Sequence, residues 1–279
     1  MSTITADQLS AIGRVLNDAN RPIGQRFRAL FTLRNIGGTG SVDQICECLL
    51  ADESALLKHE CAYCLGQIQD THAIPVLNRV LANTAEHPMV RHEAAEALGA
   101  IGDRQSLDVL KVRIDCVDLS VTSVANCLSS YVQKYLNDSN KSVSETCSLA
   151  IQRIEYLSDE TKERVMDTSV PFKSVDPVPA VRCDETDIGK LEALLTDANN
   201  DLFSRYRAMF ALRNLNTDAS ARALANGLQC PDSALFRHEV AYVLGQMQKP
   251  CTVAQLAANL ADFGENEMVR HECAEALGN

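Results

Sequence analysis

The dipeptide His-Glu occurs four times in this chain and uses four of its six histidines. The four copies are His59-Glu60, His92-Glu93, His238-Glu239 and His271-Glu272. The two copies in each half of the chain are separated by the same number of residues. Each copy in the first half is also separated by one constant interval from its counterpart in the second half. Neutral imidazole and carboxylate together form the ligand set that holds iron, manganese or zinc. The regular spacing therefore predicts a duplicated metal-binding scaffold.

The segments that carry these motifs recur with a solenoid-like period. A period of about 33 residues, which separates His59 from His92, is typical of stacked helix pairs. Six related segments begin at Arg26, Lys58, Arg91, Arg205, Arg237 and Arg270. The first segment of each half has Phe27-Arg28 or Tyr206-Arg207 in place of His-Glu. Only the second and third segments of each half are therefore candidates for metal binding.

Each segment has the periodicity of an amphipathic helix. In the third segment, an apolar stripe runs from Val90 through Ala94, Ala97, Leu98 and Ile101. At about 100° per residue, His92 falls opposite this stripe, and Glu93 and Glu96 fall on the polar flank. No segment shows the alternation of a strand. The sequence predicts an all-α fold, a right-handed α-solenoid of HEAT-like helical-hairpin repeats in two pseudo-symmetric halves.

Composition narrows the class of protein. The net charge of −11 argues against a general nucleic-acid binder and suits a cationic substrate or partner, although an ordinary acidic protein has the same charge. No stretch approaches the roughly 20 apolar residues of a membrane span, and the N-terminus lacks a secretion signal. We expect a soluble, cytoplasmic protein with no membrane partner.

The eleven cysteines favour reduced thiols over a disulfide framework, because no secretion signal precedes them. Cys61 and Cys64 form a C-x-x-C pattern, which is compatible with a zinc or redox site. Their counterparts in the second half, at the offset that relates the motifs, are Val240 and Val243. Small residues of the core are therefore the better interpretation.

The ligand types leave several metal chemistries open. The position four residues after each histidine is Tyr or Glu, so the metalloprotease pattern H-E-x-x-H is absent. Ferritin-like bundles use Glu-x-x-His, which is a different order and spacing. Four imidazoles and four carboxylates suit two ions, each with two histidines and at least one carboxylate. Such sites are usual for Fe(II) that activates oxygen, and a two-zinc or two-manganese hydrolase remains possible.

Several segments resemble those of the deoxyhypusine hydroxylase family. They are RFRALFTLR, LLKHECAYCLGQIQD, MVRHEAAEALGAIGD, RYRAMFALRN, LFRHEVAYVLGQMQ and MVRHECAEALG. The resemblance covers nearly the whole chain. It implies a di-iron monooxygenase that binds two Fe(2+) ions and uses O2 and an external reductant. The substrate that it implies is the deoxyhypusine side chain of eukaryotic translation initiation factor 5A, whose hydroxylation completes hypusine.

The resemblance also implies roles for the individual motif residues. The implied metal ligands are His59, His92, Glu93, His238, His271 and Glu272. Glu60 and Glu239 belong to the same motif, and we favour substrate-amine binding over an outer-shell role for them. Residues one turn after the histidines are candidates for an outer shell, namely Tyr63, Glu96, Tyr242 and Glu275, and packing explains the two tyrosines equally well. Met89 and Met268 are expected to be core residues.

The chain divides into residues 1–168, a proline-containing linker at 169–187, and residues 188–279, which lack the last repeat. The interval from Val90 to Val143 exceeds the repeat period by about 20 residues, and we place this surplus at 112–133. This insertion is either a loop or a translated intron. Because no further repeat covers the last motif helix, we expect iron to bind less firmly in the C-terminal half.

The main alternative function is a non-enzymatic HEAT-repeat scaffold for protein interactions, which explains the fold and the acidity. It gives no reason for four His-Glu motifs at one repeat position. A phycobilin-lyase-like HEAT protein is a second alternative that needs no iron. Metal content separates both alternatives from the oxygenase.

Overall fold

A computed structural model describes residues 4–102, 135–158 and 171–278. The described residues form helices, turns and irregular segments, and none of them lies in a strand. The chain separates into two compact units, Met1–Asp159 (unit 1) and Glu160–Asn279 (unit 2). The predicted all-α solenoid is confirmed. Among the described residues, no helix is both long and apolar enough to span a membrane.

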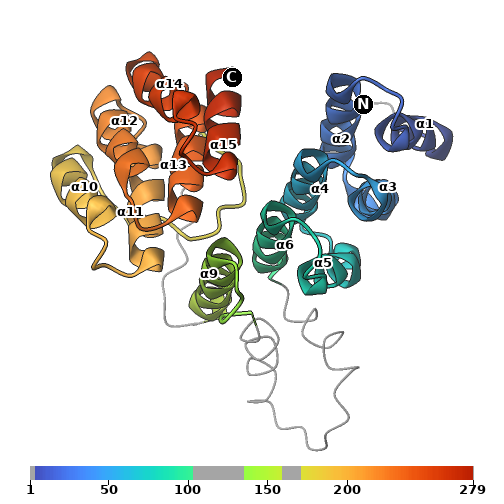
Figure 1. The fold of residues 1–279 in the computed structure, drawn as a ribbon, viewed down its shortest axis with the longest axis horizontal. Coiled ribbons are helices and arrows are strands. Elements are labelled where there is room, and N and C mark those ends of the chain that lie inside the picture. Colours follow the sequence, from blue (N-terminus) through green and yellow to red (C-terminus); the bar gives the residue numbers. More distant parts are fainter. Residues whose placement is uncertain (1–3, 103–134, 159–170, 279) are drawn as a thin grey trace, which may run out of the picture. The chain divides into compact units, whose positions relative to one another are not determined.

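Unit 1 is built from helix pairs. Their first helices are α1 (Ala6–Asn17), α3 (Gly38–Ala51) and α5 (Ile74–Ala82), and their second helices are α2 (Ile23–Ile36), α4 (Ala55–Ile68) and α6 (Pro88–Ile101). The helix α9 (Lys141–Ser158) packs against α6. The second helices follow one another in one layer and the first helices form the other (Figure 1).

Unit 2 repeats this arrangement. Its first helices are α10 (Ile188–Thr196), α12 (Asp218–Ala225) and α14 (Val253–Ala261), and its second helices are α11 (Leu202–Leu215), α13 (Ala234–Met247) and α15 (Glu267–Gly278). The helix α13 packs against both α11 and α15. The four His-Glu motifs therefore lie on α4, α6, α13 and α15, which are the second helices of equivalent pairs.

The second helices start and end at residues that suit these positions. Ser54 and Ser233 precede α4 and α13, and each hydroxyl accepts a hydrogen bond from the backbone N–H three residues later. The same two helices end at Gln69 and Gln248, which adopt the left-handed conformation with φ of 56° and 50°. The duplication therefore extends from the motifs to the helix ends.

Two glycines allow close approach between neighbouring second helices. A Cβ atom built on Gly66 of α4 would lie 2.9 Å from Cα of Ala97, and one built on Gly99 of α6 would lie 2.8 Å from Cβ of Ala150 in α9. Real Cβ atoms essentially never pack this closely. The absence of a side chain at these positions lets α4, α6 and α9 stack tightly and holds the motif residues in register.

Each second helix carries a basic residue directly before the place of the His-Glu motif, and this residue connects successive helix pairs. Arg26, Arg91, Arg205 and Arg270 each donate from Nε to the carbonyl oxygen ten residues earlier, at 2.8–3.0 Å. In most repeats a carboxylate that lies just before the next second helix pairs with the basic group. These repeat ion pairs are Arg26–Asp52, Lys58–Glu86, Arg91–Asp138, Arg205–Asp232 and Arg237–Glu265.

The repeat ion pairs also measure the length of the repeat. The acid follows the base by 26–28 residues in four of them, but by 47 residues in Arg91–Asp138. The interval that follows the third segment is therefore about 20 residues longer than the others. This agrees with the surplus predicted from the sequence, although the assigned insertion, 112–133, lies outside the described residues.

The described part of the predicted linker packs on unit 2. Val181 N–H donates to the Arg207 carbonyl at 3.5 Å, and Nε of Arg207 donates to the Pro179 carbonyl at 3.1 Å. Val178 is fully buried. Residues 179–183 thus lie along α11 instead of standing away from the helices. The division at 168 and 188 stays a prediction.

Candidate metal centre

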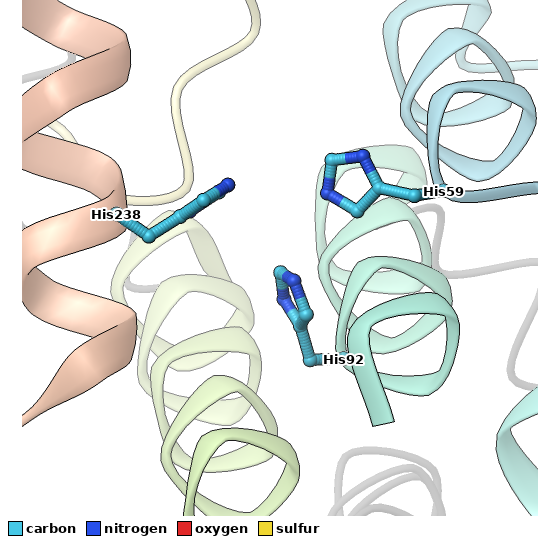
Figure 2. Close-up of side chains that lie close together, drawn as sticks. All are labelled: His59, His92 and His238. Atoms are coloured by element: carbon cyan, nitrogen blue, oxygen red, sulfur yellow. The ribbon is translucent and has the colours of Figure 1, made fainter. Parts of the chain in front are cut away.

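In unit 1, three of the predicted ligands converge between α4 and α6. His59 Nε2 lies 3.2 Å from Oε2 of Glu93, and the ring centroids of His59 and His92 are 5.5 Å apart. Figure 2 shows these two rings projecting from α4 and α6. All three residues are buried. The packing of α4 against α6, through Gly66 and Ala97, therefore brings residues one repeat apart into one cluster.

The electrostatics of this cluster favour a cation. Nδ1 of His59 lies 3.0 Å from Oε1 of Glu60, while its Nε2 faces Glu93. Burial alone would lower the pKa of His59, but the charge of Glu93 and the hydrogen bond to Glu60 outweigh burial and raise the pKa well above its ordinary value. Two buried carboxylates thus demand nearby positive charge, which a divalent ion would supply.

Unit 2 repeats the central imidazole–carboxylate contact of this cluster. His238 Nε2 lies 3.3 Å from Oε2 of Glu272, compared with 3.2 Å for the equivalent atoms of His59 and Glu93. Nε2 of His271 is 3.9 Å from the same Glu272 oxygen. His238, which Figure 2 also draws, projects from α13, and the other two residues lie on α15. One glutamate on α15 is therefore shared by both histidines.

Each unit also contains a three-residue group whose donor atoms suit a metal. In the group His92, Glu93 and Glu96, one potential ligand atom per residue lies within 4.8 Å of the others, and the same holds for His271, Glu272 and Glu275. Imidazole and carboxylate donors at this separation fit Fe(2+), Mn(2+) or Zn(2+). The residues present in both units thus fit the metal that the sequence implies.

The motif side chains of α6 are more buried than the sequence suggested, since it placed them opposite the apolar stripe or on the polar flank of the helix. His92 is fully buried and Glu93 is 4 % exposed. The prediction placed both residues off the apolar stripe of α6, which holds, but it did not foresee that neighbouring helices cover the other side as well. The helix α6 packs against α4, α5 and α9, so almost its entire circumference is enclosed.

The other residues singled out from the sequence lie either near the ligand clusters or in the helix core. Glu96 and Glu275 lie beside the ligand clusters, whereas Tyr242 accepts a hydrogen bond from Gln246 at 3.0 Å. The residues expected in the core are buried there, namely Met89, Met268, Cys61 and Cys64. Burial raises the pKa of both the Cys61 and the Cys64 thiols well above the ordinary value, which fits packing residues and not metal-binding thiolates.

The basic residues that precede the motifs were not anticipated as part of the site. Lys58, Arg91, Arg237 and Arg270 each directly precede a motif histidine. These basic residues hold the ligand-bearing helices against their neighbours. Lys58, Arg91 and Arg237 form ion pairs with acids outside the ligand clusters. The sequence contained the signal: a basic residue at the same place in every segment, followed in most of them by an acid after a similar interval.

Comparisons with known proteins agree with the repeat architecture. A model of HEAT repeats matches residues 42–129, and a model of the PBS lyase HEAT-like repeat matches residues 204–230. Deoxyhypusine hydroxylase of Homo sapiens is 50 % identical over 275 residues, and that of Drosophila melanogaster is 49 % identical over 275 residues. Each alignment covers 99 % of this chain and 82 % of the relative.

A solved structure of human deoxyhypusine hydroxylase in complex with glycerol is similar in fold as well as in sequence. It superimposes with a TM-score of 0.83 at 50 % identity, covering 98 % of this chain and 85 % of that chain. The likeness therefore extends over both units and includes all four motif helices.

Proposed function

This chain belongs to the deoxyhypusine hydroxylase family and is a hydroxylase of deoxyhypusine, and we propose that it acts through two Fe(2+) ions held by its His-Glu motifs. The proposed ligands are His59, His92 and Glu93 in unit 1 and His238, His271 and Glu272 in unit 2. The scaffold alternative is not favoured, because the relatives that match this chain over nearly its whole length are enzymes.

The observation that carries the proposal is the repeated geometry around one glutamate in each unit. The contacts His59–Glu93 and His238–Glu272 have nearly equal distances of 3.2 and 3.3 Å, and the two glutamates are 4 % and 5 % exposed. Two units would not preserve a buried imidazole–carboxylate contact of this kind for stability alone, since removing charge from water is expensive. Metal binding supplies the reason.

If bound by these ligands, Fe(2+) would supply a binding site for O2 and pass on to it the electrons that the reductant provides. The overall reaction inserts one oxygen atom into a C–H bond of the side chain and releases the other as water. Two electrons and two protons are needed for this balance, and we propose that an external reductant provides the electrons. The protein fixes the ligands, excludes water and holds the substrate carbon near the site.

The residues around the ligands have separate tasks in this proposal. Glu60 lies beside Nδ1 of His59, so we propose that it orients this ring and leaves Nε2 to bind a metal. Substrate-amine binding, the role that the sequence favours for Glu60 and Glu239, stays a prediction for both residues. Glu275 is 39 % exposed at its side chain, so we propose that it and Glu96 meet the ammonium groups of the incoming side chain.

We propose that the substrate is the deoxyhypusine side chain of eukaryotic translation initiation factor 5A, as the family implies. The protein then acts in the cytoplasm on this folded partner, and its acidity favours the encounter with a polyamine-like side chain. Neither a nucleic acid nor a membrane is required.

The test is conversion of deoxyhypusine to hypusine in the purified substrate protein. We expect conversion with Fe(2+), O2 and a reductant, and none with the metal-free protein or under anaerobic conditions. Zn(2+)-loaded protein is the control for hydrolytic chemistry. Equal conversion by metal-free protein, after chelation and verified absence of iron, would contradict the proposal.

A further inference from the structure

A short segment of the predicted linker forms a polar clamp on unit 2. The segment Phe172–Asp176, which we call the strap, crosses the last turns of α11 and α13. Asp176 receives two hydrogen bonds from the guanidinium of Arg213, at 2.7 and 2.6 Å, so the pair is bidentate. Arg213 is 2 % exposed, and its guanidinium carbon lies 4.9 Å from the Phe172 ring centroid and 4.8 Å from that of Phe210.

The clamp continues from Arg213 to the helix that carries His238. Arg213 donates to Oε1 of Gln246 at 3.0 Å, and Nε2 of Gln246 donates to Ser174 Oγ and to the hydroxyl of Tyr242, both at 3.0 Å. Tyr242 lies four residues after His238 on α13, so the two residues occupy the same face of the helix. The strap is thus connected by hydrogen bonds to the face of α13 that bears a proposed ligand.

Unit 1 has the same residues on its helices but a different environment. The counterparts of Arg213, Tyr242 and Gln246 are Arg34, Tyr63 and Gln67, at the offset that relates the His-Glu motifs. Arg34 is half-buried, donates to Asn35 beside it and stacks on Phe31 at 5.3 Å. Arg213 of unit 2 therefore contacts the strap. Among the described residues, no equivalent strap contacts its counterpart Arg34 in unit 1.

We propose that the strap positions the metal ligands of unit 2, acting through Arg213, Gln246 and Tyr242. Arg213 ties the end of α11 to the end of α13, which limits how α13 can rotate about its axis and therefore where His238 points toward Glu272. The strap residues act through Arg213 and Gln246 and are positioning residues. This inference rests on the proposed function, because it assigns the strap to the metal site of that function.

The experiment separates the two units by their ligands. Titration of metal-free protein with Co(2+), an absorbing substitute for Fe(2+), is carried out in two backgrounds. His59→Ala with His92→Ala leaves the ligands of unit 2, and His238→Ala with His271→Ala leaves those of unit 1. Asp176→Asn is then added to each, and Arg34→Lys serves as the matched control for Arg213→Lys.

We expect Asp176→Asn and Arg213→Lys to weaken Co(2+) binding by up to about tenfold in the background that retains unit 2, because an indirect contact should not exceed the low end of the roughly 10–100-fold loss for a direct outer partner of a ligand. The same variants should leave the background that retains unit 1 unchanged, as should Arg34→Lys in both. Ser174→Ala, which keeps the ion pair, should give a smaller loss of the same kind. Hydrogen exchange should rise in α13 and not in α4.

Two failures are distinguishable. If the wild-type protein binds no Co(2+), the proposed function fails. If the wild type binds two ions and the strap variants, shown by circular dichroism to be folded, keep the wild-type affinity in the unit 2 background, the strap inference is wrong and the proposed function stands. An equal loss in both backgrounds would also overturn the inference, because the effect would then be one of general stability.

Discussion

At the scale of single residues, the site depends on histidines that are buried beside carboxylates. His59, His92 and His238 are each less than 5 % exposed, whereas His72 forms a surface contact of 2.8 Å with Asp43. His271 is the most exposed of the four motif histidines, with a side chain that is 15 % exposed. The expectation that the C-terminal half holds iron less firmly stays a prediction.

We expect His59→Ala to remove at least one of two bound irons and to lower hydroxylation by more than about 100-fold, since loss of a ligand exceeds the roughly 10–100-fold effect of an outer partner. His72→Ala is the control, because its ring lies on the surface. Iron analysis and the hydroxylation assay on both variants provide the measurement. Full iron content in folded His59→Ala protein would remove His59 from the ligand set.

At the scale of helices, the repeat ion pairs and the glycine contacts determine how the motif helices stack. The sequence predicted which segments are helices, because apolar periodicity reports the face that packs. It did not predict the burial of His92, since periodicity of one helix says nothing about how many neighbours surround it. The strap was also missed, because Phe172–Asp176 has no periodicity and its contacts lie 37 or more residues away in sequence.

The contact between Gly99 and Ala150 predicts a destabilising substitution. Gly99→Ala places a methyl group 2.8 Å from Cβ of Ala150 and 3.1 Å from its Cα, so α9 must move, at a cost of about 1–3 kcal/mol. Gly189→Ala in α10 is the control, since no atom lies within 4 Å of the added Cβ, and it should stabilise by up to about 1 kcal/mol. Urea unfolding of both variants measures the difference, and equal stabilities would argue against tight stacking of α6 and α9.

The repeat ion pair of Arg91 with Asp138 predicts a further loss of stability. Both side chains are less than 10 % exposed, so Asp138→Ala leaves a buried guanidinium without its carboxylate and should cost about 3–5 kcal/mol. Lys141→Ala interrupts the contact of Lys141 with Glu145, in which the lysine is 67 % exposed, and should cost less than about 1 kcal/mol. Thermal and urea unfolding compare them. A small effect of Asp138→Ala would show that this pair does not fix the packing across the longer interval.

At the scale of the whole molecule, the duplication explains most of what could be foreseen. The constant offset between the halves correctly related the helices that carry the repeated segments, because each repeat packs only on its neighbours. What the duplication could not indicate is where the halves differ, as in the strap on Arg213 compared with Arg34. Such differences arise from segments outside the repeats.

Acid should destabilise both units through two acids of the repeat ion pairs, Asp138 in unit 1 and Glu265 in unit 2. The hydrogen bond from Arg91 lowers the pKa of Asp138. Burial alone would raise the pKa of Glu265, but the hydrogen bonds from Arg237 and from the backbone N–H of Asn266, together with the charge of Arg237, outweigh burial and lower the pKa. A lowered pKa in the folded state gives stability that is present above the unfolded pKa of about 4 and is lost as the pH falls toward the folded pKa.

We therefore expect the urea midpoint to fall between about pH 5 and pH 3, where these acids become protonated, and the fall to be shallower in Asp138→Asn. Measuring the midpoint at several pH values, for the wild type and for Asp138→Asn, checks this. Parallel curves for the two proteins would exclude Asp138 as a contributor.

The central claim is that two repeated clusters of histidine and glutamate hold two irons, and metal content per folded chain tests it most directly. The measurement is iron per chain in protein that is purified anaerobically with Fe(2+), and in matched variants that lack the histidines of one unit. We predict two irons in the wild type and fewer in each variant. Less than one iron in the folded wild-type protein, or two irons retained by both variants, would contradict the account.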